Sequence, residues 1–148
     1  MMRTLTAVLF IWAGLLAGVS FVATPAKFLA PSLPMTQALD VGRWTFHVLS
    51  SAEAGFVAVA AVLILMAWRS DAAGIGIIAG LIGIVAVLLA AESFVLRPLL
   101  DARVLRIMAG ESVPPNQSHN VYIALEAVRL VLILAAATIA IRSIEGRS

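Results

Sequence analysis

The sequence predicts an all-α integral membrane protein: one domain, residues 1–148, folded as an up-down bundle of four transmembrane helices. The first observation is composition, because 62% of the residues are hydrophobic and only 12% are charged. A soluble domain carries about 25% charged residues. The second observation is that four apolar stretches each reach the roughly 20 residues that a helix needs to cross a bilayer. The third is the absence of cysteine, which removes disulfides, thiol chemistry and cysteine-based metal centres.

The four apolar stretches cover residues 5–24, 46–68, 73–96 and 119–141, and each is followed by a proline or an arginine. The link between the second and third stretches is very short, so these two are predicted to form a tight hairpin. Both chain termini then fall on the hairpin side. A signal peptide is the less favoured interpretation of the first stretch, because its apolar part is longer than a usual signal core.

Helices 2 and 3 are predicted to extend beyond the membrane on the side opposite the hairpin. Pro34 fits the start of a helix, since proline is tolerated in the first turn, and no proline follows it before the second stretch. The second helix is therefore expected to begin near Met35. Residues 98–108 keep helical spacing of apolar and polar positions, so the third helix is expected to continue past Pro98 with a kink, or this segment forms an interfacial helix.

Four ionisable residues fall within the predicted spanning helices: Glu53, Glu92, Glu126 and Arg129. Each costs at least a few kcal/mol in a bilayer, so each is a candidate functional residue. A rise of about 1.5 Å per residue places the three glutamates, each on a different helix, at a similar depth. Arg129 lies one turn deeper than Glu126 on the same helix face. We expect the carboxylates to face the interior, Arg129 to pair with Glu126, and Glu53 and Glu92 to stay available to a ligand.

Other polar residues gather in the same half of the predicted bundle. The candidate ligand residues among them are His47, His119 and Tyr122, and the supporting charges are Arg43, Arg97, Asp40 and Lys27. One interpretation is a salt-bridge network that fixes helix register, with Glu53 or Glu92 paired to Arg43 or Arg97. The other is a cavity open to one side, which binds or translocates a small cation, a proton or a polar solute. The sequence alone does not decide between these two interpretations.

The sequence also argues for or against several other classes of function. A net charge of +2 without a basic patch argues against nucleic-acid binding. No nucleotide-binding loop, Ser/His/Asp order or HExxH motif is present, so hydrolysis has no positive support, and an enzymatic role stays uncertain. A redox enzyme holding haem through His47 and His119 is less favoured, since two histidines without a motif are more often hydrogen-bonding residues. The cofactor stays undetermined, with a metal cation ahead of haem, and an accessory subunit of a larger membrane complex is the third class.

Glycines recur at close spacing on two of the predicted helices: Gly14 and Gly18 on the first, and Gly76, Gly80 and Gly83 on the third. Small residues at such spacing let helix backbones approach closely in lipid. The favoured interpretation is packing inside one bundle, and the alternative is a homodimer seam. The three tryptophans, Trp12, Trp44 and Trp68, are expected to anchor helices at the membrane interface or to pack, and not to bind a cofactor.

The positive charges at the two ends of the predicted bundle are nearly balanced, so they orient it weakly. The hairpin side holds Arg3, Arg69, Arg142 and Arg147. The opposite side holds Lys27, Arg43, Arg97, Arg103 and Arg106. The hairpin-side arginines lie at the membrane ends and have no other evident role, whereas those opposite can belong to the polar site. The termini are therefore expected in the cytoplasm, in a multi-pass protein of the cell membrane.

Several short segments together resemble the transmembrane protein 205-like family, which comprises small four-helix membrane proteins largely of unknown function. The segments are Phe21–Phe28, Leu33-Pro34, Phe46-His47, Arg97-Pro98, Pro114-Pro115 and His119–Glu126. The resemblance covers most of the chain, although each motif is short. It implies a four-helix topology and a polar site at these positions, and it implies no reaction.

Overall fold

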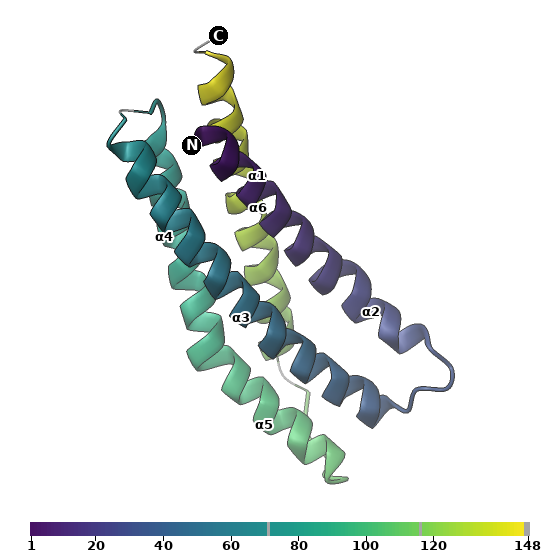
Figure 1. Cartoon of the computed structure of the whole chain (residues 1–148). Coiled ribbons are helices and arrows are strands. Elements are labelled where there is room, and N and C mark those ends of the chain that lie inside the picture. Colours follow the sequence, from purple (N-terminus) through teal and green to yellow (C-terminus); the bar gives the residue numbers. More distant parts are fainter. Residues whose placement is uncertain (71, 116, 147–148) are drawn as a thin grey trace.

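The structure is a computed structural model that describes residues 1–70, 72–115 and 117–146. Over these residues the chain is all-helical and contains no strand. Four helices are long and apolar enough to cross a membrane: Met2–Leu29, Met35–Trp68, Ile75–Met108 and Ser118–Glu145. Figure 1 shows these four segments side by side, with both chain ends and the link between the second and third segments at one end of the molecule. Arg147, which was counted for the orientation, lies outside the described residues.

Two of the four segments are composite, and two are single helices. The first runs through α1 (Met2–Leu16), the π-helical η1 (Ala17–Ala23), α2 (Thr24–Ala26) and the 3-10 turn η2 (Lys27–Leu29). The third runs through α4 (Ile75–Ala91), the π-helical η3 (Glu92–Leu96) and α5 (Arg97–Met108). The second segment is α3 (Met35–Trp68), and the fourth is α6 (Ser118–Glu145).

The predicted helical extensions are confirmed as continuous helix. Helix α3 begins at Met35, directly after Pro34, and α5 carries the third segment on to Met108. The predicted end of the first helix at Thr24 is wrong, because helical turns continue past Pro25 to Leu29. Pro25 is the second residue of α2, inside this continuous helical segment and two residues after η1.

A π-helical stretch interrupts the first and the third of the four helical segments. Each π-helical stretch is followed by one residue and then by a proline. Segment η1 precedes Thr24-Pro25, and η3 precedes Arg97-Pro98. A proline ring crowds the carbonyl four residues earlier and has no N–H to donate, so a regular α-helix cannot pass through it unchanged. The wider π turn absorbs this mismatch. The simple kink expected at Pro98 is therefore a change of helix type.

The apolar core fills the half of the molecule near the α3–α4 link. Helix α6 packs against α1 and α4, and α3 packs against the same two helices from the other side. The buried positions of α4 recur every three or four residues, as expected for one helix face: Ile75, Ile78, Ile82, Val85 and Leu89. The closest packing uses alanine, and these alanines are fully buried: Ala60, Ala67, Ala136, Ala137 and Ala140. Their small side chains let the helix backbones approach one another.

The expectation that the glycine faces pack inside the bundle is wrong for most of these glycines. A Cβ atom built at Gly14, Gly18, Gly80 or Gly83 would meet no other atom within 4 Å, and all four positions are exposed. Alanines of α3 and α6, which the sequence analysis did not single out, take the packing role instead. The glycine faces point outward, so the alternative of a homodimer seam stays a prediction.

Gly74 opens α4 in a left-handed conformation, with φ at 75°, and a Cβ there would lie 2.9 Å from Ile139 Cγ2 of α6. Gly110, after α5, has φ at 82° but open space around its Cβ position. A left-handed residue with a Cβ costs about 1–2 kcal/mol. We expect Gly74→Ala to lower the free energy of unfolding more than Gly110→Ala does, because only Gly74→Ala also meets Ile139. Thermal unfolding of both variants in detergent measures the difference, and equal losses would contradict this expectation.

Candidate functional site

One face of α6 carries the polar site and the apolar core in succession. Its buried positions follow helical spacing: Tyr122, Glu126, Arg129, Ile133, Ala136 and Ala140. Residues three or four apart share a helix face. The face is polar in the half that begins at Ser118 and apolar in the half that ends at Glu145. It therefore carries charged side chains into the same interior that the hydrophobic core fills further along.

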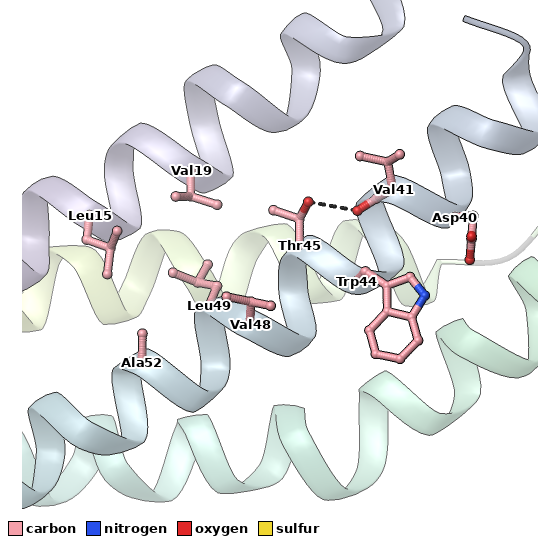
Figure 2. Close-up of a pocket in the computed structure, with 9 residues that line it drawn as sticks. All are labelled: Leu15, Val19, Asp40, Val41, Trp44, Thr45, Val48, Leu49 and Ala52. Carbon is pink, nitrogen blue, oxygen red and sulfur yellow. Dashed lines mark hydrogen bonds between the residues drawn. The ribbon is translucent and has the colours of Figure 1, made fainter.

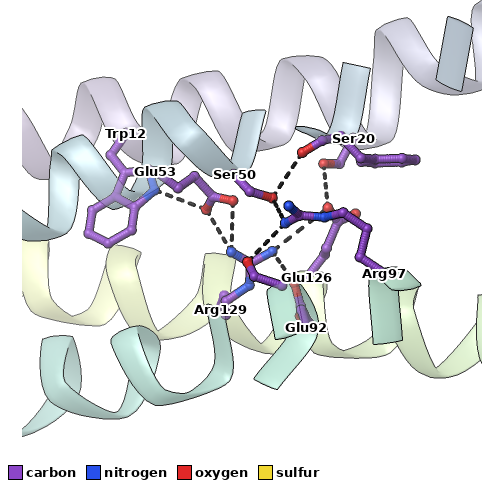
Figure 3. A network of polar contacts seen from close by, with 10 residues as sticks. Trp12, Ser20, Ser50, Glu53, Glu92, Arg97, Glu126 and Arg129 are labelled. Atoms are coloured by element: carbon purple, nitrogen blue, oxygen red, sulfur yellow. Dashed lines mark hydrogen bonds and ion pairs between the residues drawn. The ribbon is translucent and has the colours of Figure 1, made fainter. Parts of the chain in front are cut away.

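Arg129 lies at the centre of the three buried glutamates, as Figure 3 shows. Its Nη1 donates to both Oε1 and Oε2 of Glu53, each at 2.8 Å. Its Nη2 lies 2.6 Å from Oε2 of Glu92 and 3.7 Å from Oε1 of Glu126. None of the four side chains is more than 2% exposed. The prediction that the carboxylates face the interior is confirmed.

The predicted division of roles among the three acids is wrong. The Glu126–Arg129 pair exists, but at 3.7 Å it is the longest of the three contacts. Glu53 and Glu92, which were expected to stay available, make the short ones. The guanidinium reaches across the bundle to α3 and η3 and not back along its own helix. Glu126 instead accepts a hydrogen bond from Ser20 Oγ of η1 at 3.0 Å.

Glu92 is held by charge and not by hydrogen bonds. Its Oε2 is close to Arg129 Nη2, yet neither oxygen of this carboxylate has a partner with hydrogen-bond geometry among the described residues. A buried polar group without a hydrogen bond costs about 1–3 kcal/mol, and more when it is charged. Glu92 is therefore the least well satisfied of the three acids.

Trp12 of α1 belongs to the charge cluster, and the sequence analysis did not predict this. The indole Nε1 donates to Glu53 Oε1 at 3.1 Å, and the side chain is fully buried. Its ring stacks on Phe56 with 5.8 Å between centroids. Trp44 and Trp68 are more than half exposed, which fits the anchoring role expected of them. The available signal was chemical, since a tryptophan inside an apolar helix needs an acceptor for its N–H.

Replacing Trp12 with phenylalanine should keep most of the packing and remove the hydrogen bond to Glu53. Hydrogen bonds to charged groups contribute about 1.5–3 kcal/mol, so we expect a loss of stability of this size for Trp12→Phe. Trp44→Phe is the matched control, because that ring is exposed. Unfolding midpoints in detergent compare the two, and equal midpoints would show that the indole N–H does not support Glu53.

The predicted pairing of Arg43 or Arg97 with the deep glutamates is wrong, beginning with Arg43. Its Nη2 lies 2.9 Å from Asp40 Oδ1 on the preceding turn of α3. Its guanidinium also lies 5.2 Å from the centroid of the Trp44 ring. Arg43 and Asp40 lie on the extension of α3, too far along the helix to join the Arg129 cluster. They form a local pair that neutralises both charges.

Arg97, at the start of α5, has hydroxyl partners in place of a carboxylate. Its Nη2 donates to Ser50 Oγ of α3 and to Ser93 Oγ at 2.9 Å. Its Nε is buried and has no hydrogen-bond partner among the described residues. No salt bridge joins Arg97 to a carboxylate within residues 1–70, 72–115 and 117–146. Arg97 thus lies beside the cluster without a direct ionic partner.

A cavity of about 410 Å³ lies next to the charge cluster, with all four helical segments on its wall. The wall residues are Ser20, Phe21, Thr24, Pro25, Lys27, Phe28, Leu39, Gly42, Arg43, Phe46, Arg97, Leu100, Asp101, Val104, His119, Tyr122, Ile123 and Glu126. Six predicted site residues thus share one cavity: Lys27, Arg43, Arg97, His119, Tyr122 and Glu126. The other predicted members, Asp40, His47, Glu53, Glu92 and Arg129, are not on this wall.

Asp101 is the cavity acid that the sequence analysis left out of the site. Its Oδ2 lies 2.7 Å from Nε2 of His47, which ties the extension of α3 to α5. The signal for it was its spacing, because Asp101 lies four residues after Arg97 and therefore on the same helix face. It was treated only as a polar position of an extended helix. His47 is thus engaged outside the cavity, whereas His119 lies on its wall.

The part of the chain that the structure describes contains no group of three or more His, Asp or Glu side chains placed to hold a metal ion. The three glutamates, which the sequence offered as possible ligands, converge on the guanidinium of Arg129. Their oxygens therefore face a positive charge that a metal ion would have to replace. This arrangement favours an ion-pair cluster over a metal centre.

A second cavity, of about 490 Å³, lies between the first helical segment and α3 (Figure 2). Its lining is almost wholly apolar: Leu15, Val19, Asp40, Val41, Trp44, Thr45, Val48, Leu49 and Ala52. Thr45 Oγ1 donates to the Val41 carbonyl of its own helix at 2.7 Å. Asp40 is paired with Arg43. Asp40 and Thr45 thus already have partners, and apart from the indole N–H of Trp44 the rest of the lining is apolar, so the first cavity is the candidate site.

The chain matches no protein-family model, no curated protein and no solved structure. Its resemblance to the transmembrane protein 205-like family therefore stays a prediction.

Proposed function

We propose that the protein is a multi-pass membrane protein whose four long helices cross the cell membrane as an up-down bundle. The outward surface supports this, because large apolar side chains are widely exposed on it. Examples from three segments are Ile11 at 62%, Leu65 at 65% and Val87 at 68% exposure. Soluble monomers rarely expose contiguous apolar surface of this kind. Lipid covers these side chains, the ends of α3 and α5 extend beyond the membrane, and the termini lie in the cytoplasm.

The function that the site supports best is reversible binding of a proton at Glu126. Three carboxylates (−3) surround one guanidinium (+1), which leaves −2 when all are ionised. A surplus charge of this size is costly in a dry interior unless a proton or a cation offsets it. Glu126 is the acid with the longest contact to Arg129, and it alone of the three lies on the cavity wall. That position is the observation that carries the proposal.

A proton fits the cavity better than the other ligands that the sequence left open. Lys27 and Arg97 on the wall repel a metal cation, whereas a proton can pass along hydroxyl and imidazole groups. Tyr122 and His119 supply such groups, four and seven residues before Glu126 on the same helix face. They continue the cavity wall from Glu126 toward the start of α6. The proton therefore reaches Glu126 from one side of the membrane only.

Infrared difference spectroscopy across a pH step tests this function on the purified protein in detergent. A carboxyl group that gains a proton acquires a C=O stretching band. We expect the parent to show such a band, and Glu126→Gln to lack it. Glu111→Gln is the matched control, because Glu111 is an exposed acid outside the cavity that pairs with Arg106. An identical difference spectrum for parent and Glu126→Gln would contradict the proposal.

The outward glycine faces support a homodimer as the partner of this chain. Gly14 and Gly18 leave open space where side chains would lie, so a second α1 can approach closely. The chain has no cysteine, and a single Gly14→Cys variant therefore reports on this face alone. Disulfide-linked dimers of Gly14→Cys, and their absence for a Val62→Cys control on the exposed face of α3, are expected. Equal cross-linking of the two variants would contradict the seam.

A further inference from the structure

The cavity beside Glu126 carries charges of both signs on its wall. The cations are Lys27, Arg43 and Arg97, and the acids are Asp101 and Glu126. Both acids have direct partners other than these cations, because Asp101 contacts His47, and Glu126 accepts from Ser20 and lies 3.7 Å from Arg129. Among the described residues, neither acid makes a salt bridge with a cation of the wall.

Two of these cations lack an ionic partner. Arg43 is neutralised by Asp40. Across the described ranges, no salt bridge joins Lys27 or Arg97 to a carboxylate. Arg97 holds only serine hydroxyls, and its Nε has no hydrogen-bond partner among the described residues. A buried or half-buried cation without a direct counter-charge is costly, so an anionic group placed against these two cations would stabilise both side chains.

Lys27 is placed at the cavity by a glycine. Its ammonium lies against the backbone of Gly42 on α3, where a Cβ atom would collide with Nζ. The same ammonium lies 5.0 Å from the centroid of the Phe28 ring. A glycine at position 42 is therefore what lets the ammonium of η2 settle against α3. The chain brings this charge to the cavity wall without giving it a carboxylate.

The rest of the wall is apolar and aromatic. Phe21, Phe46, Leu100 and Val104 come from three different helical segments and line the same space. Phe46 also packs edge to face on Tyr122, with 5.0 Å between ring centroids. Ligand pockets for small molecules span about 300–1,000 Å³ and combine apolar walls with a few placed polar groups. At about 410 Å³ the cavity has the size and the lining of such a pocket.

We propose that this cavity binds an amphiphile that carries one carboxylate or phosphate group on an apolar body. The anionic group lies between Lys27 and Arg97 and supplies the direct ionic partner that both cations lack. The apolar body lies against the aromatic and aliphatic side chains. An uncharged apolar molecule would leave both cations unpaired, and a small hydrated anion would leave the apolar wall uncovered. This binding does not require Glu126 to exchange a proton.

Native mass spectrometry of the purified protein in a neutral detergent tests the proposal with oleate, oleyl alcohol and benzoate as probes. One charge-assisted contact contributes about 1.5–3 kcal/mol, and 1.4 kcal/mol is a factor of ten. We therefore expect oleate to bind at least about tenfold more tightly than oleyl alcohol, and Lys27→Gln to weaken oleate about tenfold. Gly42→Ala, which displaces the ammonium, should weaken oleate in the same direction.

Three further variants separate this binding from other effects. Arg97→Gln should weaken oleate, and Arg97→Lys should keep most of the binding because it keeps the charge. Arg106→Gln on α5 should leave binding unchanged, since Arg106 pairs with Glu111 away from the wall. Glu126→Gln should bind oleate at least as tightly as the parent, because it removes a negative charge from the same wall, so that a failure of proton uptake at Glu126 is distinguished from a failure of this site.

The probes also distinguish the source of the ligand. Oleate binding with the expected losses supports a membrane-derived amphiphile, and benzoate binding with the same losses supports an anion taken from water. The proposal is overturned if neither anion binds, if oleyl alcohol binds as tightly as oleate, or if Lys27→Gln and Gly42→Ala both bind oleate like the parent.

Discussion

Replacing Arg129 with leucine is expected to lower the free energy of unfolding by about 3–5 kcal/mol, the usual effect of orphaning a buried ionic partner. Glu53 and Glu92 each lose their closest positive charge, and both are at most 1% exposed. Glu53 also loses two hydrogen bonds from Nη1. Thermal unfolding in detergent, followed by circular dichroism, measures the change.

Two controls isolate the ionic contribution to this loss. Arg142→Leu removes an exposed arginine of the same helix and should leave the unfolding midpoint nearly unchanged. Combining Arg129→Leu with Glu53→Gln should recover part of the stability, because one of the orphaned carboxylates is then neutral. An Arg129→Leu protein as stable as the parent would show that the guanidinium does not stabilise the cluster.

The helices and the depth of the charged layer could be predicted because both follow from spacing along one chain. A run of apolar residues fixes where a helix lies, and a rise of about 1.5 Å per residue fixes which residues share a level. Glu53, Glu92 and Glu126 were placed at one level and in the interior by this argument, and they are buried together. The long helix from Met35 also followed, since nothing between its start and the apolar run breaks it.

Which partner each charge takes could not be predicted from spacing. Arg129 and Glu126 are three residues apart, yet the long arginine side chain reaches other helices, and the rotation of α3 and η3 brings Glu53 and Glu92 nearer. Helix rotation depends on how all the segments pack. The indole of Trp12 depends on the same packing, because its acceptor lies on another helix. Such contacts are properties of the assembled interior.

The sequence did not predict the π-helical turns or the outward position of the glycines, and the reason differs from the one above. The prolines at positions 25 and 98 showed that the helices must deviate there, but a kink, a break and a π turn all satisfy that requirement. Gly14 and Gly18 were assigned to internal packing because small residues permit close approach. A glycine that permits close approach of two helices does not by itself make a contact. The small residues buried in the interior are instead alanines of α3 and α6.

Glu53→Gln and Glu126→Gln are expected to differ sharply in stability, although each replaces one buried acid by its amide. Glu53 receives two hydrogen bonds from Arg129 and one from Trp12. Its amide cannot accept all three through one oxygen, and the amide nitrogen would face a guanidinium donor. We expect a loss of about 3 kcal/mol, the lower end for a broken buried pair, because Glu92 still balances part of the charge of Arg129.

Glu126→Gln should lose no more than about 1 kcal/mol, the size of one ordinary hydrogen bond. Its contact with Arg129 is long, and an amide oxygen can still accept from Ser20. Chemical or thermal unfolding of the two variants in the same detergent gives the comparison directly. If Glu126→Gln were the more damaging, Glu126 would be the structural partner of Arg129, and the cavity-facing acid would not be free to exchange a proton. If Glu53→Gln is the more damaging, Glu126 is the acid that can change its charge while the bundle stays folded.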